Sequence, residues 1–286
     1  MKKKDIKLMT CKDYTVSNET FELILDEKLD MLRTSPKPNK EALGKYYESI
    51  SYISHTDANE SLFDKVYQIV KNYTIKRKVR LLNSLGTEDK KILDIGCGTG
   101  DFLEACKNKQ WKISGLEPNE NARSLAIKKT ETVIHTNIEE LIEGYHEPFD
   151  VISMWHVLEH VADLNEYIGY LKKLLKPNGT LIVAVPNFKS YDAAYYGEFW
   201  AAYDVPRHLW HFSQKSIGLV FKDFDLEVVK TLPMKFDAYY VSLLSEKYMT
   251  SKSNPVKAFY RGFISNLKAK QNNEYSSLIY LIKNKK

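Results

Sequence analysis

The sequence predicts an α/β protein built on a doubly wound, mostly parallel sheet. Three observations support this fold class. A short apolar run over 92–95 is followed at once by three glycines at alternate positions over 96–100. A second strand pattern over 112–116 ends in an acid, Glu117. From Lys91 onward, strand-like and helix-like segments alternate, as they do when helices cover both faces of a parallel sheet.

Length and composition fit one large domain with additions. The chain has 286 residues and a formal net charge of +5 from 42 basic and 37 acidic residues, without the strong basic excess of a dedicated nucleic-acid binder. Its three cysteines, at positions 11, 97 and 106, have no paired spacing, which favours a reducing compartment. No signal-peptide pattern and no apolar run of membrane-span length occurs, so we expect a cytoplasmic protein.

Residues 1–80 are predicted to be an N-terminal extension with a helical lid, which precedes a core domain at 81–286. The extension contains a strand-like stretch at 15–25, a loop at 35–39 and helix-period material at 62–82. Four basic residues of its last part are expected on a solvated helix face, from which one side chain could reach a bound anion: Lys76, Arg77, Lys78 and Arg80.

Local signals define the first two strands of the core and their helices. The glycines of the first turn allow positive φ and a close approach of the backbone to a ligand. A helix pattern opens at Asp101, and the start of a helix offers unpaired N–H groups. The second helix is expected over 119–129, with Asn119 as its N-cap.

The middle of the chain continues the alternation. Strand patterns recur at 132–135, 149–156 and 181–185. The run Lys-Pro-Asn-Gly-Thr at 176–180 ends a helix that begins at Asp163, because proline and glycine stop helices.

The C-terminal part is predicted to add a helix, two strands and an insertion. Ser213 is expected to cap a helix over 214–222. Strand patterns follow at 226–229 and 275–282, and between them lies a helical insertion at about 235–273, which Asn-Pro at 254–255 interrupts.

The spacing of the glycines shows which kind of cofactor-binding loop this chain resembles. A dinucleotide-binding loop needs a glycine where this chain has Asp101, and a P-loop needs a Gly-Lys-Ser/Thr run that does not follow. The pattern Asp94-x-Gly96-x-Gly98-x-Gly100 resembles motif I of the class I S-adenosylmethionine (SAM) dependent methyltransferases. SAM is a sulfonium cation without phosphate, so an acid at the end of the strand suits it.

The resemblance covers roughly residues 81–232 and the last dozen residues, and it implies a Rossmann-like, seven-stranded sheet with an antiparallel C-terminal strand. It implies that Asp94 faces the methionine or ribose part of SAM and that Glu117 accepts hydrogen bonds from the ribose hydroxyls. Asn137 stands where many members use Asp to hold the adenine, and Trp155 would pack on the adenine or shape the methyl site. The predicted cofactor-binding residues are Asp94, Gly96, Cys97, Gly98, Gly100, Glu117, Pro118, Asn137, Ile138, Met154, Trp155, Tyr47 and His55.

In the resembled family, a segment before the first strand lies over the SAM pocket as a lid. Here the tyrosine-rich stretch 41–60 takes that place, with Tyr47, Tyr52 and His55 as candidate contacts. Ordinary packing of these side chains is the alternative.

Two features bear on metal binding. Some related methyltransferases carry an N-terminal zinc-binding cysteine cluster, of which only Cys11 remains here. Glu159 and His160 resemble the acidic and histidine groups that can hold a divalent cation in ubiquinone-type O-methyltransferases. Since no complete ligand set is visible in either place, no metal is predicted.

Methyl transfer from a sulfonium requires the protein to align the nucleophile and, for a hydroxyl, to remove its proton. Histidine is the natural base near neutral pH, and the candidates are His156, His160, His208 and His211. Of these, His156 and His208 are predicted to be catalytic together with Arg207, which would bind an anionic substrate group. Pairing of Arg207 with Asp204 to hold a loop is the alternative.

Residues 187–213 form an aromatic-rich insertion after the strand at 181–185, at the edge where doubly wound sheets bind ligands. We expect it to form the acceptor pocket, and the alternative is a small core under the loop. Its run Pro-Arg-His-Leu-Trp-His-Phe-Ser at 206–213 resembles one found in a bacterial methyltransferase branch whose substrates are mostly unassigned.

We therefore predict a bacterial, cytoplasmic, SAM-dependent methyltransferase that acts on a small-molecule or carrier-bound acceptor, with oxygen favoured over nitrogen and carbon. The Asn/Asp-Pro-Pro-aromatic run of DNA amino-methyltransferases is absent after 149–156, so DNA is not expected as a substrate. Two alternatives stay open. An RNA methyltransferase would need a continuous basic surface beside the SAM site, and a SAM-binding regulatory protein would need no acceptor.

Overall fold

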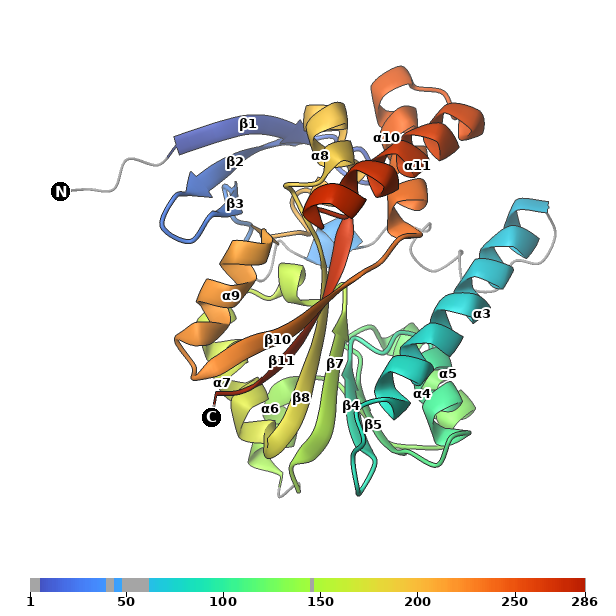
Figure 1. Cartoon of the computed structure of the whole chain (residues 1–286), viewed down its shortest axis with the longest axis vertical. Helices are drawn as coiled ribbons and strands as arrows, with labels where there is room; N and C mark the ends of the chain where they lie inside the picture. Colours follow the sequence, from blue (N-terminus) through green and yellow to red (C-terminus); the bar gives the residue numbers. More distant parts are fainter. Residues whose placement is uncertain (1–5, 40–43, 48–61, 145–146, 286) are drawn as a thin grey trace.

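A seven-stranded sheet in the order β10-β11-β8-β7-β4-β5-β6 forms the centre of the molecule (Figure 1). The computed structural model describes residues 6–39, 44–47, 62–144 and 147–285, without the side chains of 62–67. β11 is antiparallel to both neighbours, whereas the pairs β4-β5, β4-β7, β5-β6 and β7-β8 are parallel. The predicted fold class is confirmed. The strands are β4 (Lys91–Ile95), β5 (Lys112–Leu116), β6 (Ile134–His135), β7 (Phe149–Trp155), β8 (Leu175–Pro186), β10 (Leu226–Pro233) and β11 (Ser277–Asn284).

Helices cover both faces of this sheet (Figure 1). One face carries α3 (Leu62–Asn83), α4 (Asp101–Lys107) and α5 (Glu120–Thr130), and the other carries α6 (Ile138–Glu143), α7 (Leu164–Leu174) and α9 (Gln214–Lys222). Successive side chains of a strand point to opposite faces. Ile92 and Val151 therefore pack with α3 and α4, while Leu93 and Ile152 pack on the side of α7 and α9.

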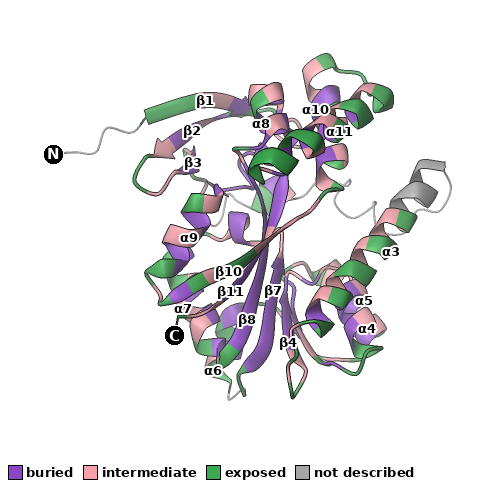
Figure 2. Cartoon of the chain, in the orientation of Figure 1, coloured by how far each residue is buried: buried purple, intermediate pink, exposed green. Residues whose placement is uncertain are grey.

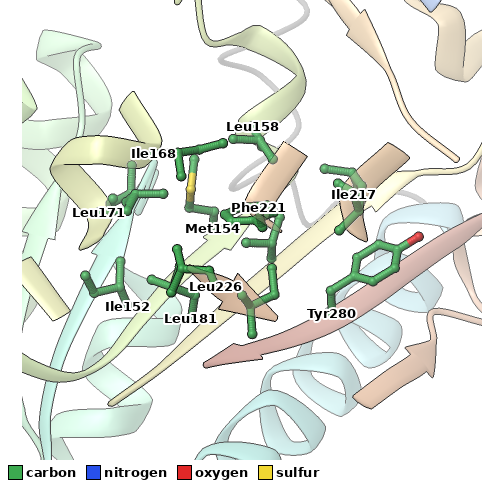
Figure 3. Packing of buried hydrophobic residues seen from close by; sticks show 14 of the residues in the cluster. Ile152, Met154, Leu158, Ile168, Leu171, Leu181, Ile217, Phe221, Leu226 and Tyr280 are labelled. Carbon is green, nitrogen blue, oxygen red and sulfur yellow. The ribbon is translucent and has the colours of Figure 1, made fainter. Parts of the chain in front are cut away.

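The core between the sheet and α7 and α9 is mostly apolar. Met154 from β7 lies among Leu158, Ile168 and Phe221 (Figure 3). β7 and β8 are buried over almost their whole length (Figure 2), as expected for central strands of a parallel sheet.

Most predicted element boundaries agree with the structure to within a few residues. Asn119 caps α5 by accepting from Ala122 N, and Ser213 caps α9 in a capping box with Ser216. The predicted turn at 176–180 instead lies inside β8. Phe149 pairs with Leu175 but Val151 pairs with Thr180, so these residues form an irregularity in the strand pairing.

The N-terminal residues and the insertion after β8 form a second sheet, which the sequence did not predict. Its order is β1 (Ile6–Lys12), β2 (Thr20–Asp26), β3 (Met31–Ser35), β9 (Trp210–His211), and every pair is antiparallel. Leu32 of β3 pairs with His211 of β9. The extension is therefore joined to the aromatic insertion by backbone hydrogen bonds.

Three further helices lie near this second sheet (Figure 1): α8 (Tyr191–Tyr196), α10 (Asp237–Thr250) and α11 (Pro255–Asn272). Asn254 caps α11 at the predicted break in the helical insertion. Short 3₁₀ turns occur at Gly44–Tyr47, Leu158–His160, Gly197–Phe199 and Ala201–Tyr203. None of the helices in the described ranges combines the length and apolar character needed to cross a bilayer.

The division at residue 80 stays a prediction. α3 runs across it, and Val79 and Leu82 on the two sides of the boundary both pack in the core with Ile92 and Phe102. The lid stretch 48–60, with Tyr52 and His55, lies outside the described residues.

Candidate functional site

The turn after β4 has the backbone shape that its glycines predict. Gly96, Gly98 and Gly100 have φ of +70°, +55° and +81°. A Cβ on Gly100 would lie 3.0 Å from the Cα of Ala126 in α5, and a Cβ on Gly96 would lie 2.5 Å from a methyl carbon of Val157. A larger residue at either position would thus push apart the elements that enclose the turn.

Two acids flank this turn. Asp94 at the end of β4 is buried and accepts a hydrogen bond from Ser153 Oγ of β7. Burial raises the pKa of Asp94 to about 7, although the Ser153 bond and the charge of Lys78 work in the other direction. Glu117, which follows β5, accepts one hydrogen bond of 2.9 Å from Gly98 N and another from Asn119 N. Both predicted acids therefore lie at the glycine turn.

The other predicted cofactor residues occupy several places around the same edge. Cys97 is buried, and Ile138 and Met154 have side chains in the core, so only their backbone would face a cofactor. Asn137 caps α6 by accepting from Glu140 N at 3.0 Å. The indole N–H of Trp155 is buried and has no acceptor in the described part of the chain.

Lys78 does not lie on a solvated helix face, in contrast to the sequence prediction. Its Nζ is 4.1 Å from the ring centre of Trp155 and 5.8 Å from that of Phe102. Burial lowers the pKa of Lys78, while the charges of Asp94 and Asp237 raise it. The helical pattern could not show this, because the contact depends on how α3 packs on the end of β7.

His156, the first residue after β7, lies between two carboxylates. Its Nε2 is 3.0 Å from Asp237 Oδ2, and its Nδ1 is 3.3 Å from Glu159 Oε1. Burial disfavours the charged imidazole, but the hydrogen bonds to Asp237 and Glu159 outweigh it and raise the pKa of His156 to about 10. This pKa favours the imidazolium at neutral pH, and the role of His156 as a base stays a prediction.

Asp237 is a site residue that sequence analysis missed. It is the first residue of α10, inside the segment interpreted only as a helical insertion, and it lies 81 positions from His156. An acid in the first turn of a helix is ordinary for capping, so its type and position carried no signal of this contact.

Two further histidines, His160 and His208, lie beside Glu159. Glu159 is fully buried, its Oε1 lies 4.0 Å from His208 Nε2, and the rings of His160 and His208 meet edge to face at 4.6 Å. Burial raises the pKa of Glu159, but the His156 bond and the three histidines outweigh this and lower it to about 2. The predicted lid residue Tyr47 places its hydroxyl 3.0 Å from His160 Nδ1.

Ligand atoms of Glu159, His160 and His208 lie within 4.8 Å of one another, so these three side chains could hold a metal ion. His160 Nδ1 is already 3.0 Å from the carbonyl oxygen of Arg207. Burial and the neighbouring His208 lower the pKa of His160 to about 4, so its ring is neutral and can act as a ligand at neutral pH. The expectation of no metal stays a prediction.

Arg207 is buried, and its guanidinium contacts acceptors inside the protein. Nη2 donates to Asp13 at 3.0 Å, Nε donates to Asp204 at 3.0 Å, and Nη1 donates to the carbonyl oxygen of Tyr46 at 3.1 Å. These bonds connect the end of β1 to the insertion. This geometry agrees with the alternative in which Arg207 pairs with Asp204 to hold the loop. A catalytic role for Arg207 stays a prediction.

The aromatic residues of 187–213 mainly pack against one another and against the second sheet. Tyr196, Trp200 and Tyr203 share a buried cluster with Phe21 and Leu32 of β2 and β3. Their predicted role in binding an acceptor stays a prediction, and the alternative of a core under the loop accounts for their burial.

A cavity of about 340 Å³ opens beside the end of β7, between α3, the end of β10 and the start of α10. Trp155 and Asp237 line it, so it adjoins the His156–Asp237 pair. Its other lining residues include four basic and two aromatic side chains, together with apolar residues such as Leu81, Met234 and Ile279. The basic and aromatic ones are Arg77, Lys78, Arg80, Lys235, Tyr73 and Phe236. Sequence analysis did not predict this location for a pocket.

Comparison with known proteins identifies the family. The methyltransferase domain family matches residues 67–231, which is more than half of the chain. The chain belongs to the class I SAM-dependent methyltransferases. This methyltransferase is 32% identical over 146 residues to a ubiquinone biosynthesis O-methyltransferase of Bradyrhizobium diazoefficiens, which covers 48% of this chain and 56% of the relative. It is 37% identical over 113 residues to the protein of that name from Histophilus somni, covering 36% and 47%. The chain thus spans about half the length of these curated relatives.

Solved structures show the same fold. A SAM-dependent methyltransferase from Archaeoglobus fulgidus superposes with a TM-score of 0.51 at 19% identity, covering 74% of this chain and 94% of the other. Magnesium protoporphyrin IX methyltransferase from Synechocystis, with bound S-adenosylhomocysteine, gives a TM-score of 0.52 at 14% identity, covering 80% and 90%.

The residues of this methyltransferase fit SAM, the cofactor that its family uses. Beside Gly98 there is open space, and Glu117 stands next to this glycine with two acceptor oxygens. The unsatisfied donor of Trp155 lies at the end of the neighbouring strand. Asp94, Glu117 and Trp155 would hold the cofactor at this edge.

Replacing Asp94 with Asn is expected to stabilise the cofactor-free methyltransferase at neutral pH. The amide can still accept from Ser153 but carries no buried charge. Because the pKa of folded Asp94 is raised, the stability that it contributes is complete below pH about 4 and lost as the pH rises to about 7. The increase in the free energy of unfolding caused by Asp94→Asn should therefore grow between pH 4 and pH 7 to about 2–4 kcal/mol.

Thermal unfolding of both proteins between pH 4.5 and pH 8 measures this gain. Asp223→Asn, which changes an exposed carboxyl, is the control. A stability difference that stays constant with pH would contradict the raised pKa of Asp94.

Proposed function

We propose that the chain transfers a methyl group from SAM to a small-molecule or carrier-bound acceptor, with a hydroxyl oxygen as the favoured acceptor atom. The observation that supports this proposal most is the His156–Asp237 pair. His156 directly follows β7, and Asp237 lines the cavity. The names of the relatives, which are O-methyltransferases, agree with oxygen as the acceptor atom. SAM, when bound, supplies a methyl group activated by a positively charged sulfur.

The chain's own residues would align the acceptor and receive its proton. Bound SAM would supply the methyl group to the acceptor oxygen, and the carboxylate of Asp237 would receive the hydroxyl proton. His156, predicted to be the base, donates its Nε2 proton to Asp237 and holds that carboxylate toward the cavity. Glu159 holds His156 from the other side.

Arg207 and His208, predicted to be catalytic, are proposed to act through this cluster. His208 Nε2 lies 4.0 Å from Glu159 and also 4.0 Å from Asp204, which binds Arg207. Their side chains thus fix Glu159 and the loop that carries them, and Glu159 in turn orients His156.

We further propose that the acceptor carries a phosphate or carboxylate group. The cavity has four basic side chains, and within the described ranges Arg77, Arg80 and Lys235 form no ion pair with a carboxylate. Arginine and lysine in a confined space attract anions and fix them by charge-assisted hydrogen bonds. Tyr73 and Phe236 add an aromatic wall, with their rings 5.4 Å apart.

Replacing Glu117 with Ala is expected to weaken SAM binding by about 1–3 kcal/mol, because two hydrogen bonds to the ribose would be lost. Isothermal titration calorimetry with SAM and with S-adenosylhomocysteine measures this. Glu120→Ala, three residues further in the first turn of α5, is the control and should bind normally. Unchanged affinity in Glu117→Ala would refute the ribose assignment.

The activity itself is tested with tritium-labelled SAM and two fractions of a bacterial extract, which are small molecules separated on an anion-exchange column and total RNA. Label should enter compounds that the column retains. Label only in unretained compounds would contradict an anionic acceptor, and label lost after ribonuclease treatment would support an RNA methyltransferase. No transfer despite SAM binding would support the regulatory alternative.

A further inference from the structure

α11 packs with its small residues inward and its large apolar residues outward. The residues that it buries are Ala258, Gly262, Ser265 and Ala269. The opposite side carries five large apolar side chains with exposed fractions of 82%, 64%, 55%, 46% and 39%: Val256, Phe259, Tyr260, Phe263 and Leu267. Figure 2 shows exposed residues along this helix, which lies with α10 at one end of the molecule. A helix that only packs on its own protein shows the reverse arrangement.

The contact with α10 explains the small inward residues. A Cβ on Gly262 would lie 2.9 Å from the carbonyl oxygen of Ala238 and 2.9 Å from the Cα of Tyr239. α10 and α11 are therefore in close backbone contact, which larger residues would prevent. Of the outward side chains, Phe259 also stacks on Tyr239 of α10, with ring centres 4.9 Å apart. Tyr240 of α10, 50% exposed, extends the same apolar character.

The charge of this hairpin is strongly positive. Residues 235–273 contain seven lysines and arginines and two acids, a net charge of +5, which equals that of the whole chain. Glu246 is fully buried and pairs with Lys257 at 3.0 Å, whereas Asp237 pairs with His156, so the two acids offset only one basic side chain of this hairpin. By helical spacing, Arg261 and Lys268 lie along one flank of the apolar stripe, over the rings of Tyr195 and Tyr191 of α8. Lys268 is exposed there, and the exposed Lys270 lies in line with the stripe.

We propose that the exposed face of α10 and α11 binds the surface of an anionic lipid bilayer. An aromatic and aliphatic stripe flanked by lysine and arginine is the composition with which helices lie in the interface, apolar side chains between the headgroups and basic ones at the phosphates. A second copy of the chain is the less suitable occupant, because it would bring two surfaces of the same positive charge together. The proposal does not depend on methyl transfer.

Vesicle co-sedimentation of the full chain tests it. Vesicles of phosphatidylcholine with about 30% phosphatidylglycerol should bind the chain, vesicles of phosphatidylcholine alone should bind it at least about tenfold less, and added salt should release it. The double variant Phe259→Ser with Phe263→Ser should lose at least about tenfold in binding, because two aromatic side chains no longer enter the interface.

The control is Val133→Ser, which removes an apolar side chain that is 70% exposed before β6 and should bind as the unchanged chain does. Phe259 is 64% exposed but stacks on Tyr239, so thermal unfolding of both variants is measured and binding is compared below their unfolding temperatures. Equal binding to both kinds of vesicle, or equal binding by the double variant, would overturn the proposal. A dimer in light scattering that the double variant turns into a monomer would overturn it in favour of a second copy.

Discussion

Replacing Asp237 with Asn is expected to lower methyl transfer by about 10²–10⁴-fold while SAM affinity is retained. The amide fills the same space but cannot receive the acceptor proton, and it no longer pairs with the His156 imidazolium. Single-turnover kinetics with the acceptor fraction from the tritium assay measures the loss. Asp225→Asn, which changes a carboxylate that is 84% exposed and paired with Lys172, is the matched control.

The pH dependence distinguishes the two members of the pair. The pKa of His156 is raised to about 10, so its charged form persists from acid to mildly alkaline pH and is lost as the pH rises through about 10. If His156 holds Asp237 as an imidazolium, activity should fall as this proton leaves. A rate that instead increases between pH 7 and pH 10 would show that neutral His156 is itself the base, as the sequence predicted.

Replacing Arg207 with Met should lower the free energy of unfolding by about 3–5 kcal/mol, because Asp13 and Asp204 would keep their charges without their partner. Asp13 is fully buried, and among the described residues its carboxylate otherwise accepts only from groups of its own turn, including Thr15 N and Ser17 N. Urea unfolding measures the loss, and Arg80→Met, on the exposed side of α3, is the control.

A loss below about 1 kcal/mol together with a large fall in activity would show that Arg207 acts on the substrate instead. The double variant Arg207→Met with Asp204→Asn should recover part of the stability, because one stranded charge is removed.

The parts of the fold that the sequence predicted are those set by near neighbours. The apolar run 92–95 with its glycines specifies a strand and a tight turn within ten residues, and Ser213 caps α9 through contacts three residues away. The glycine turn and Glu117 were predicted for the same reason, since both lie within one β-α-β unit.

The missed features all depend on contacts between distant segments. β9 has only two residues and is a strand because β3 lies beside it, so no alternation in 206–213 could show it. Asp237 reaches His156, and Lys78 reaches Trp155, through the packing of α10 and α3 on the sheet edge. The aromatic insertion was recognised by composition, but composition does not separate a core from a pocket.

The pairing of β3 with β9 also sets the order in which the chain can fold during synthesis. His211 leaves the ribosome about 180 residues after its partner Leu32, which at about 5–20 residues per second is a delay of roughly 10–40 seconds. During this delay the seven-stranded sheet is still incomplete, and the apolar side of the β1–β3 meander, with Leu23 and Leu32, has no insertion to cover it. The segment that is made first is therefore expected to reach its final state among the last, and to be the part of the nascent chain that most needs a chaperone.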